Sequence, residues 1–324
     1  MIPSHGKSIL APSSIYSMAT KRKPTREKIT TERFFREQAE PLEMRLVAGG
    51  NGLGRTIIEP TVNRPSLALA GFTKYIAFKR IQVIGNAEAY YLKSLSVRDR
   101  IKRYSKLCSY KIPCIVFTRN LRIDRELKII ANEVGVPFFH TPMVTMRFVN
   151  LATIELDLLF APRATIQGSM VDVHGVGVLI CGESGIGKSE TVLELIERGY
   201  SLVSDDVTKM TLLDGREIVG TSSELARNHM EVRGIGIINV AAMFGAKSVR
   251  TEKRLDLVIS LKAWKDVKDI DRLGMDEDHM RILGIKVRKI SIPVRPGRNL
   301  ARLIEVAALR SEERRVGKEC RSRW

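Results

Sequence analysis

An eight-residue segment of the chain matches the phosphate-binding pattern Gly-x-x-x-x-Gly-Lys-Ser without a mismatch: Gly182-Glu183-Ser184-Gly185-Ile186-Gly187-Lys188-Ser189. In such a loop the backbone N–H groups surround phosphate oxygens, the lysine neutralises the β- and γ-phosphates, and the serine hydroxyl binds Mg²⁺. Residues 176–180 are mostly apolar and β-branched, which predicts a buried strand before the loop. After it, apolar residues recur at helical spacing as far as Gly199, a typical C-cap glycine. The sequence therefore predicts a nucleotide-binding loop at a helix N-terminus, where the helix dipole favours an anion.

Two adjacent carboxylates, Asp205 and Asp206, follow the apolar pair Leu202-Val203. An apolar strand that ends in acidic residues is the usual way in which a phosphate-loop fold holds its metal and activates a nucleophile. Because neighbouring side chains on a strand point in opposite directions, the two aspartates are expected to have different roles. A polar turn or a helix N-cap would also account for the pair.

A third segment places a carboxylate and a guanidinium, Glu231 and Arg233, ahead of two glycines and an apolar run. Taken alone, this pattern is explained equally well by a solvated ion pair before a turn. Whether this segment belongs to a functional site depends on the other motifs that accompany it in the chain.

The length of 324 residues exceeds the usual size of a single core, so two domains are expected. Residues 1–28 are basic and rich in Ser, Pro and Lys, which predicts a disordered extension. Residues 29–160 mix strand and helix patterns and predict a smaller α/β domain, whereas residues 161–309 form a second domain that contains the phosphate-binding loop. The elements expected in the first domain are strands over 81–84 and 114–118, a helix over 125–134 that ends at Gly135, and a helix over 151–160 at the junction.

The net charge of +18 raises the question of nucleic-acid binding. Part of the excess lies at the two ends, in residues 1–30 and 310–324, and aromatic residues do not alternate with basic ones as they do in single-strand binders. The pattern favours a solvated basic surface, which attracts an acidic protein or phosphate, over nucleic-acid binding.

The chain has no run of about 18 apolar residues and no apolar segment of a secretory signal near its N-terminus, so no membrane span is expected. The four cysteines, Cys108, Cys114, Cys181 and Cys320, lack metal-binding spacing and predict buried thiols. The expected location is the cytoplasm.

Taken in order, these segments resemble the bacterial HPr kinase/phosphorylase family. The resemblance covers about residues 113–309 and is strongest over 171–309. The phosphate-binding loop by itself would fit many unrelated NTPases, so five separated motifs carry the resemblance. They are the loop continued through Glu190-Thr191, Asp205-Asp206, Glu231-Val232-Arg233-Gly234-Ile235-Gly236-Ile237-Ile238-Asn239-Val240, Asp271-Arg272-Leu273-Gly274, and Pro293-Val294-Arg295-Pro296-Gly297-Arg298-Asn299-Leu300.

This resemblance implies a bifunctional enzyme with a P-loop kinase domain of the phosphoenolpyruvate-carboxykinase-like type. Such an enzyme phosphorylates a regulatory serine of HPr, a phosphocarrier protein of sugar uptake, with ATP or pyrophosphate as the donor. It also removes the phosphate by phosphorolysis, in which inorganic phosphate is consumed and pyrophosphate is released. Members of the family are homohexamers that require Mg²⁺.

The resemblance also implies a role for each motif. Lys188 and the loop would hold the β-phosphate, and Ser189 with Glu231 would bind Mg²⁺. Asp206 would take the proton of the serine, with Asp205 as an orienting residue or a water-mediated metal contact, and Arg272 would stabilise charge on the transferred group. The segment used for dephosphorylation comprises Pro293, Val294, Arg295, Pro296, Gly297 and Arg298.

Two departures from the family pattern affect these expectations. Gln167 stands where the family usually has a histidine, and an amide cannot carry a proton at neutral pH, so one direction of the reaction is expected to be weaker. Residues 310–324 are charged, poor in apolar residues and unlike the family, so we interpret them as a non-native tail that replaces the family's C-terminal helix.

Two other functions remain open at this level. A P-loop kinase of a small metabolite would phosphorylate its substrate without any HPr present. A non-catalytic basic module would turn over no ATP and would show salt-sensitive retention on nucleic acid.

Overall fold

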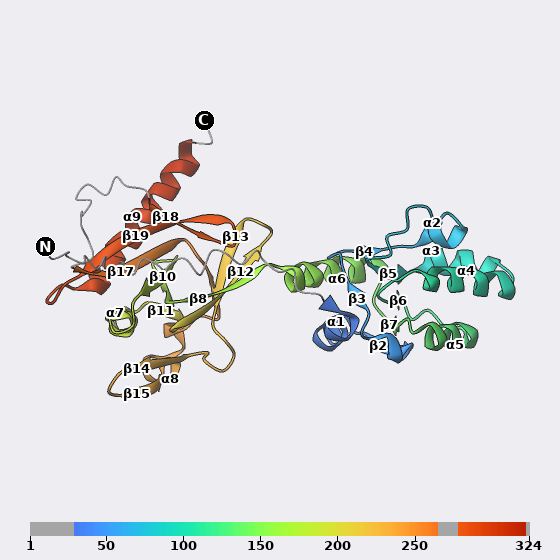
Figure 1. The fold of residues 1–324 in the computed structure, drawn as a ribbon, viewed down its shortest axis with the longest axis horizontal. Helices are drawn as coiled ribbons and strands as arrows, with labels where there is room; N and C mark the ends of the chain where they lie inside the picture. The colour runs from blue at the N-terminus through green and yellow to red at the C-terminus, as the bar shows by residue number, and fades with distance from the viewer. Residues whose placement is uncertain (1–28, 265–277, 322–324) are drawn as a thin grey trace, which may run out of the picture. The chain divides into compact units, whose positions relative to one another are not determined.

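The computed structural model of the protein describes residues 29–264 and 278–321, with side chains described through residue 313 (Figure 1). Contacts divide the chain into two units, with a boundary between Ala161 and Pro162. The predicted extension, residues 1–28, lies outside the described residues. Within the described part of the chain, no helix is long and apolar enough to cross a membrane.

The N-terminal domain is built on a five-stranded sheet in the order β2-β7-β6-β5-β4, in which only β2 is antiparallel to its neighbour. The strands are β2 (Arg45–Ala48), β4 (Val62–Asn63), β5 (Ile81–Ile84), β6 (Ile115–Phe117) and β7 (Phe138–His140), and β1 (Ile29–Thr30) pairs separately with β3 (Thr56–Ile57). The helices are α1 (Thr31–Gln38), α2 (Ser66–Ala70), α3 (Asn86–Ser94), α4 (Val97–Ser109), α5 (Arg125–Val134) and α6 (Thr145–Phe160), with a short 3₁₀ turn at Gly50–Gly52.

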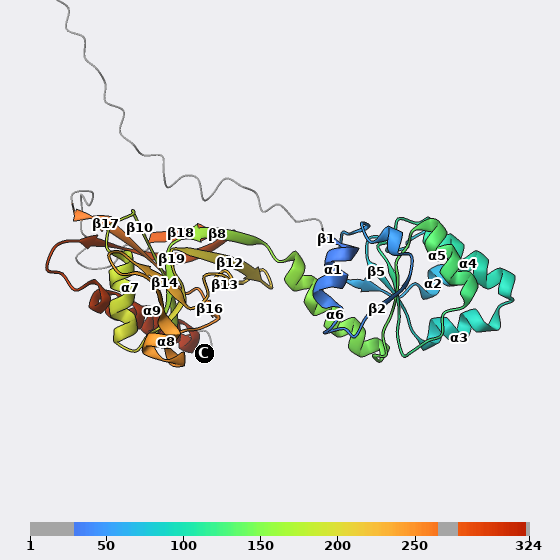
Figure 2. The same cartoon turned by 90° about the horizontal axis from the view of Figure 1, so that it is seen from below.

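Helices cover both faces of this sheet, because successive side chains on each strand point to opposite sides. Phe139 packs in the core beneath α1 and α6, whereas its neighbour Phe138 packs in the core beneath α3, α4 and α5. Figure 2 shows α1 and α6 on one side of the sheet and α3 to α5 on the other. The predicted α/β domain is confirmed.

The helix predicted over 125–134 is confirmed to the residue as α5, and Gly135 follows it with φ of 63°. A residue with a side chain is strained in this left-handed conformation, which explains why glycine marks the end of the helix. The helix predicted over 151–160 is α6, which begins earlier, at Thr145. No side chain caps its N-terminus, so the sequence offered no capping signal there.

A fully buried glutamate carboxylate, Glu88, lies in the first turn of α3. It accepts hydrogen bonds from Arg64 Nε (3.0 Å) and Nη2 (2.8 Å), from the Ser66 hydroxyl (2.5 Å) and from the Gly85 N–H (2.9 Å). Burial alone would raise the pKa of Glu88, but these hydrogen bonds outweigh it and hold the pKa below its usual value.

The pH dependence of stability follows from this lowered pKa. The carboxylate stabilises the fold above about pH 4.5, the ordinary pKa of glutamate, and this contribution is lost as the pH falls through the lower pKa of the folded state. Replacing Glu88→Gln is expected to lower the free energy of unfolding by about 1–3 kcal/mol at pH 7 and by less below pH 4. Urea unfolding at several pH values measures the difference, with Glu126→Gln, an exposed acid in the first turn of α5, as the matched control. A difference that does not change with pH would contradict the prediction.

The C-terminal domain contains a six-stranded sheet in the order β11-β9-β10-β17-β19-β18. Its strands are β9 (Ser169–Val173), β10 (Val176–Gly182), β11 (Ser201–Ser204), β17 (Leu257–Ala263), β18 (Asp278–Ile282) and β19 (Ile285–Val294). The buried strand predicted over 176–180 is confirmed as β10, which runs parallel to β17, and β17 runs parallel to β19.

The sheet beside the acidic pair is mixed, because β9 lies antiparallel between β10 and β11. The cause is a tight hairpin between β9 and β10. Its two turn residues, His174 and Gly175, have φ of 53° and 84°, as a two-residue turn with the twist of the strands requires. Because β9 reverses the direction twice, β10 and β11 still run the same way, so their carboxyl ends lie at one edge of the sheet together with those of β17 and β19.

A second, four-stranded sheet in the order β16-β13-β12-β8 covers one face of the first. The two sheets approach so closely that a Cβ added to Gly220 would lie 2.2 Å from the sulfur of Met170. The strands of the second sheet are β8 (Arg163–Gln167), β12 (Val207–Leu213), β13 (Glu217–Thr221) and β16 (Glu252–Arg254).

The other face of the six-stranded sheet packs against α7, α9 and a hairpin of β14 and β15 (Figure 2). Their bounds, with those of the short elements that follow the hairpin, are α7 (Lys188–Glu197), β14 (His229–Val232), β15 (Gly236–Asn239), α8 (Val240–Phe244), a 3₁₀ turn at Ala246–Ser248 and α9 (Leu300–Arg321). The helix α9 continues well past Leu309, where the sequence reading placed the end of the family-like part, since Glu and Arg are good helix formers.

Cys108, Cys114 and Cys181 are free and buried, as the sequence predicted. Burial raises the pKa of the Cys181 thiol, the residue just before the phosphate-binding loop, to about 11, against the opposing effect of Lys188. The group is therefore an uncharged thiol at neutral pH and contributes packing rather than a nucleophile.

Candidate active site

The predicted phosphate-binding loop joins the carboxyl end of β10 to the first turn of α7, the arrangement that the sequence predicted. Gly185 and Gly187 have φ of 82° and 99°, which side chains rarely adopt, and no side chain caps the N-terminus of α7. Glycine is needed at position 182 for a different reason, which is lack of space. A Cβ there would lie 2.9 Å from Ile186 and 3.0 Å from the carbonyl of Leu261 on β17. The loop thus presents free N–H groups of a helix start, the geometry that binds phosphate.

Lys188, the first residue of α7, folds back over this loop. Its Nζ donates to the carbonyl oxygens of Gly182 and Glu183, at 3.0 Å each. One turn later, the Thr191 hydroxyl donates to the Gly187 carbonyl at 2.6 Å and fixes the start of the helix. The ammonium group is therefore held at the mouth of the loop, where it can meet a phosphate.

The two aspartates at the end of β11 have different surroundings. The carboxylate of Asp205 accepts a hydrogen bond from the Ser169 hydroxyl at 2.8 Å and from the Glu231 N–H at 3.1 Å. Burial raises the pKa of Asp205, while these hydrogen bonds act in the opposite direction. The carboxylate of Asp206 is exposed and has no hydrogen bond from another described residue, and its backbone has φ of 53°. Asp205 is thus fixed by the structure, whereas Asp206 is open to a substrate.

Ser169 connects the two aspartates and was not expected from the sequence. Its Oγ donates to Asp205 and accepts a hydrogen bond from the Asp206 N–H at 3.3 Å. A serine at the start of a strand carries no pattern of its own, and its partners lie 36 and 37 residues away in the chain. This contact could not be found from local sequence.

The hairpin of β14 and β15 brings Glu231 and Arg233 to the same edge. Glu231 is exposed, and its backbone N–H binds Asp205 at the end of β11. Arg233 reaches the phosphate-binding loop itself, where Nη2 donates to the Ser184 hydroxyl at 2.8 Å. The sequence had given Arg233 no individual role, and its contact with the loop, 49 residues away, shows that the hairpin and the loop form one site.

The predicted dephosphorylation segment begins at the end of β19. Pro293 and Val294 are the last residues of the strand and pair with Lys262 and Ala263 of β17, whereas the rest of the segment forms the loop that leads into α9. Arg295 places its guanidinium 5.2 Å from the ring centre of Trp264, a cation–π contact. Arg272, the other arginine predicted for the site, lies outside the described residues.

Gln167 lies beside the candidate base. It is exposed at the end of β8 and pairs with Val207, which follows Asp206. The N–H of the next residue, Gly168, donates to the Asp206 carbonyl at 2.7 Å. The position at which the sequence departs from the family pattern is therefore adjacent to the exposed aspartate.

The donor atoms of Ser189, Glu231 and the two aspartates fit Mg²⁺, which takes oxygen ligands and keeps several waters. Among the described residues, no group of three or more His, Cys, Asp or Glu side chains forms a preformed metal cage. This is the arrangement expected where one or two carboxylates share the ion with substrate phosphates.

The chain is similar to known proteins over both domains. A family model described as HPr Serine kinase N terminus matches residues 29–156, and one described as HPr Serine kinase C-terminal domain matches residues 159–323. The second match includes residues 310–323, which the sequence reading had set apart as a non-native tail.

The relatives carry matching names. The protein of Oceanobacillus iheyensis named HPr kinase/phosphorylase 1 is 44% identical over 272 residues, or 84% of this chain and 88% of its own. The HPr kinase/phosphorylase of Halalkalibacterium halodurans is 42% identical over 278 residues, or 86% of this chain and 90% of its own. A solved structure of the Hpr(Ser) kinase/phosphatase from Coxiella burnetii is 35% identical, covers 49% of this chain and 96% of its own, and has a TM-score of 0.46. This chain belongs to the HPr kinase/phosphorylase family.

Proposed function

We propose that this protein phosphorylates a serine of the phosphocarrier HPr, using ATP or pyrophosphate, and removes the phosphate again by phosphorolysis. The observation that supports it best is the composition of one sheet edge. An exposed carboxylate, Asp206, stands at the same edge as the phosphate-binding loop, and Asp205 connects it to the hairpin that contacts that loop. A phosphoryl donor and an acceptor hydroxyl can therefore meet there.

In the forward direction, Asp206 accepts the proton of the serine hydroxyl as the serine oxygen bonds to the terminal phosphorus of the donor. The bond from that phosphorus to the bridging oxygen breaks, and ADP leaves, or inorganic phosphate leaves when pyrophosphate is the donor. Lys188 and the loop N–H groups hold the donor's phosphates, and Arg272 stabilises the charge of the transferred group. When bound to Ser189 and Glu231, Mg²⁺ neutralises charge on the phosphates.

The reverse direction uses the same groups. An oxygen of inorganic phosphate attacks the phosphorus of phosphoserine, the bond to the serine oxygen breaks, and protonated Asp206 returns the proton to that oxygen. The products are serine and pyrophosphate. Arg295 and Arg298, in the predicted dephosphorylation segment, supply positive charge for the incoming phosphate. The side-chain amide of Gln167 cannot take up or release a proton at neutral pH. Phosphorolysis and phosphorylation are therefore expected to differ in rate.

The test mixes the purified protein with HPr and Mg-ATP and follows phosphoserine by mass spectrometry. The second arm supplies phosphoserine-HPr and inorganic phosphate and measures pyrophosphate. HPr in which the target serine is alanine serves as the control substrate. Absence of phosphoserine in every condition would exclude the proposal, and ATP turnover with small metabolites but not with HPr would favour a small-metabolite kinase.

The proposal includes the assembly and the location of the enzyme. A homohexamer in the cytoplasm is expected, with inorganic phosphate as the second small substrate. Analytical ultracentrifugation of the full chain measures the assembly directly. A monomer at micromolar concentration would contradict the hexamer without bearing on the chemistry.

A further inference from the structure

The loop between β19 and α9 is held at both of its ends. At the first end, β19 pairs with β17 as far as Val294 and Ala263. Within the loop, the Arg298 N–H donates to the Arg295 carbonyl at 3.2 Å, and Gly297 has φ of 81°, so the loop is a tight turn with both arginine side chains exposed. The second end is Asn299, the residue before α9.

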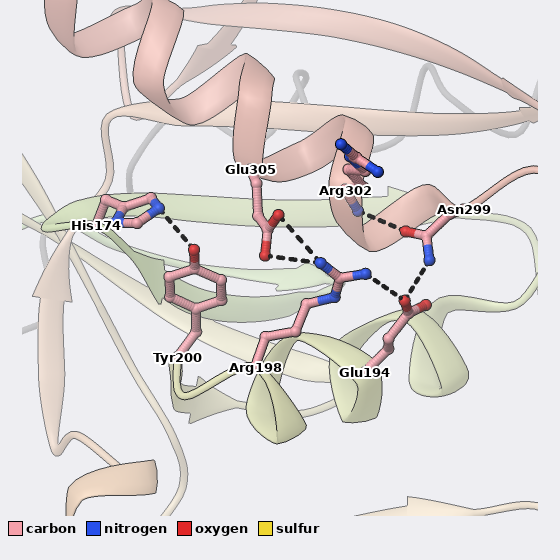
Figure 3. Close-up of polar contacts among 7 residues, drawn as sticks. All are labelled: His174, Glu194, Arg198, Tyr200, Asn299, Arg302 and Glu305. Carbon is pink, nitrogen blue, oxygen red and sulfur yellow. Dashed lines mark hydrogen bonds and ion pairs between the residues drawn. The ribbon is translucent and has the colours of Figure 1, made fainter.

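Asn299 makes two contacts with opposite ends of its side-chain amide (Figure 3). Its Oδ1 accepts a hydrogen bond from the Arg302 N–H at 2.7 Å and so caps α9. Its Nδ2 donates to Oε1 of Glu194 on α7 at 2.5 Å. A backbone N–H can only donate and a carboxylate can only accept, so these partners fix the orientation of the amide.

Glu194 is itself held by a neighbour on the same helix. Arg198 Nη2 donates to Glu194 Oε1 at 3.0 Å, and Arg198 Nη1 donates to the two carboxylate oxygens of Glu305 on α9, at 3.4 and 3.3 Å (Figure 3). Buried side chains of both helices pack in one core beneath this network, among them Leu195 and Ile304. The contact between Glu194 and Asn299 therefore rests on a packed helix pair rather than on two freely moving surface chains.

Helix α7 is also the helix that begins with Lys188. Glu194 lies six residues further on, about 9 Å along the helix axis at 1.5 Å per residue. The same helix therefore carries the phosphate-binding lysine at its start and the partner of Asn299 in its second turn. Through this contact, the two segments expected to bind phosphate are fixed to one rigid element.

We propose that Glu194 and Asn299 are positioning residues, which set the place of Arg295 and Arg298 relative to the phosphate-binding loop and so determine how well inorganic phosphate binds for phosphorolysis. This inference rests on the proposed function. Neither residue touches the reacting atoms. The hydrogen bond between Asn299 and Glu194 lies at the surface beside the ion pairs of Arg198, and such exposed contacts contribute little to stability, so the consequence is expected in geometry and phosphate binding.

A pair of complementary substitutions separates this role from a structural one. Asn299→Asp keeps the cap of α9, because aspartate is as good an N-cap residue as asparagine, but it places a second carboxylate against Glu194. Adding Glu194→Gln restores one hydrogen bond, since the glutamine amide can donate to the new aspartate. Glu194→Gln alone still accepts from Asn299 and is expected to be mild.

The readout is steady-state phosphorolysis of phosphoserine-HPr at varied inorganic phosphate, beside the rate of HPr phosphorylation by Mg-ATP. Asn299→Asp is expected to raise KM for phosphate about tenfold, the effect of losing a hydrogen bond to a charged group, while kcat of the kinase reaction stays within about twofold. The double variant is expected to return KM to within about twofold of the original. Glu197→Gln, at an exposed position of α7 outside the network of Glu194, Asn299, Arg198 and Glu305, is the control and should change neither value.

The outcomes distinguish this inference from the proposed function. If the original protein phosphorylates HPr and releases pyrophosphate but Asn299→Asp leaves KM for phosphate unchanged, the inference is wrong and the function stands. Equal losses in both directions, without rescue in the double variant, would assign the contact a purely structural role. Should Asn299→Asp fail to fold, Glu194→Ala takes its place, because it removes the acceptor and leaves the cap of α9 intact. Its KM for phosphate and its kcat in the kinase reaction are judged by the same criteria.

Discussion

Replacing Asp206→Asn is expected to reduce both phosphorylation of HPr and phosphorolysis about 100- to 10,000-fold, the range that a lost general base gives. The backbone makes this substitution a clean one. Asp206 has φ of 53°, and asparagine is one of the few residues that adopt this conformation readily, so the loop keeps its shape. The amide has almost the same size as the carboxylate but cannot accept a proton at neutral pH.

A matched control exists in the same domain. Asp214 is also exposed, has φ of 50°, and lies at the far end of β12, away from the candidate site. Asp214→Asn repeats the chemical change in the same backbone conformation and is expected to leave both rates unchanged. Calorimetric titration with ATP should give similar affinities for all three proteins. Full activity of Asp206→Asn would mean that another group takes the proton.

Replacing Lys188→Met is expected to lower kcat/KM for HPr phosphorylation about 100- to 1000-fold, the effect of removing one electrostatic contact to the transferred group. Methionine has a similar length and flexibility but no charge. Among the described residues, the lysine donates to two carbonyl oxygens, both in its own loop, so its loss is expected to leave the surrounding fold intact. Unlike Asp206→Asn, this change should also weaken nucleotide binding, because Nζ is expected to contact the phosphates directly.

Lys209→Met provides the comparison for Lys188→Met. Lys209 is exposed on β12 of the second sheet and is not part of the phosphate-binding loop, and its replacement removes the same charge. Initial rates at several Mg-ATP concentrations separate an effect on KM from one on kcat. If Lys188→Met and Lys209→Met behaved alike, the loss would reflect net charge rather than a phosphate contact.

Local signals explain which parts of the fold could be predicted from the sequence. The helix α5 has an apolar stripe and a terminal glycine, and the phosphate-binding loop has fixed spacing between a strand and a helix, so both were found with their bounds nearly correct. The antiparallel position of β9 was missed, because its five residues are all buried and show no alternation that distinguishes the direction of pairing.

The parts of the site that could not be predicted depend on contacts between distant residues. Ser169 joins two aspartates more than 30 residues away, and Arg233 contacts a serine 49 residues away. The link between Glu194 and Asn299 spans 105 residues. No periodicity or motif encodes such pairs, since each depends on how the sheet orders its strands. Motif spacing predicted the chemical groups, and topology determined which of them meet.

The position of β10 in the sheet has a consequence for the order in which the site is completed during synthesis. On one side β10 pairs with β9 across a two-residue turn, but on the other side Gly182 pairs with Leu261, 79 residues later in the chain. At the usual 5–20 residues per second, the ribosome needs about 4–16 s to supply that second neighbour. During this interval the phosphate-binding loop has been made but lacks the strand against which Gly182 packs. A nascent chain therefore acquires a complete nucleotide site only after most of the C-terminal domain has been synthesised.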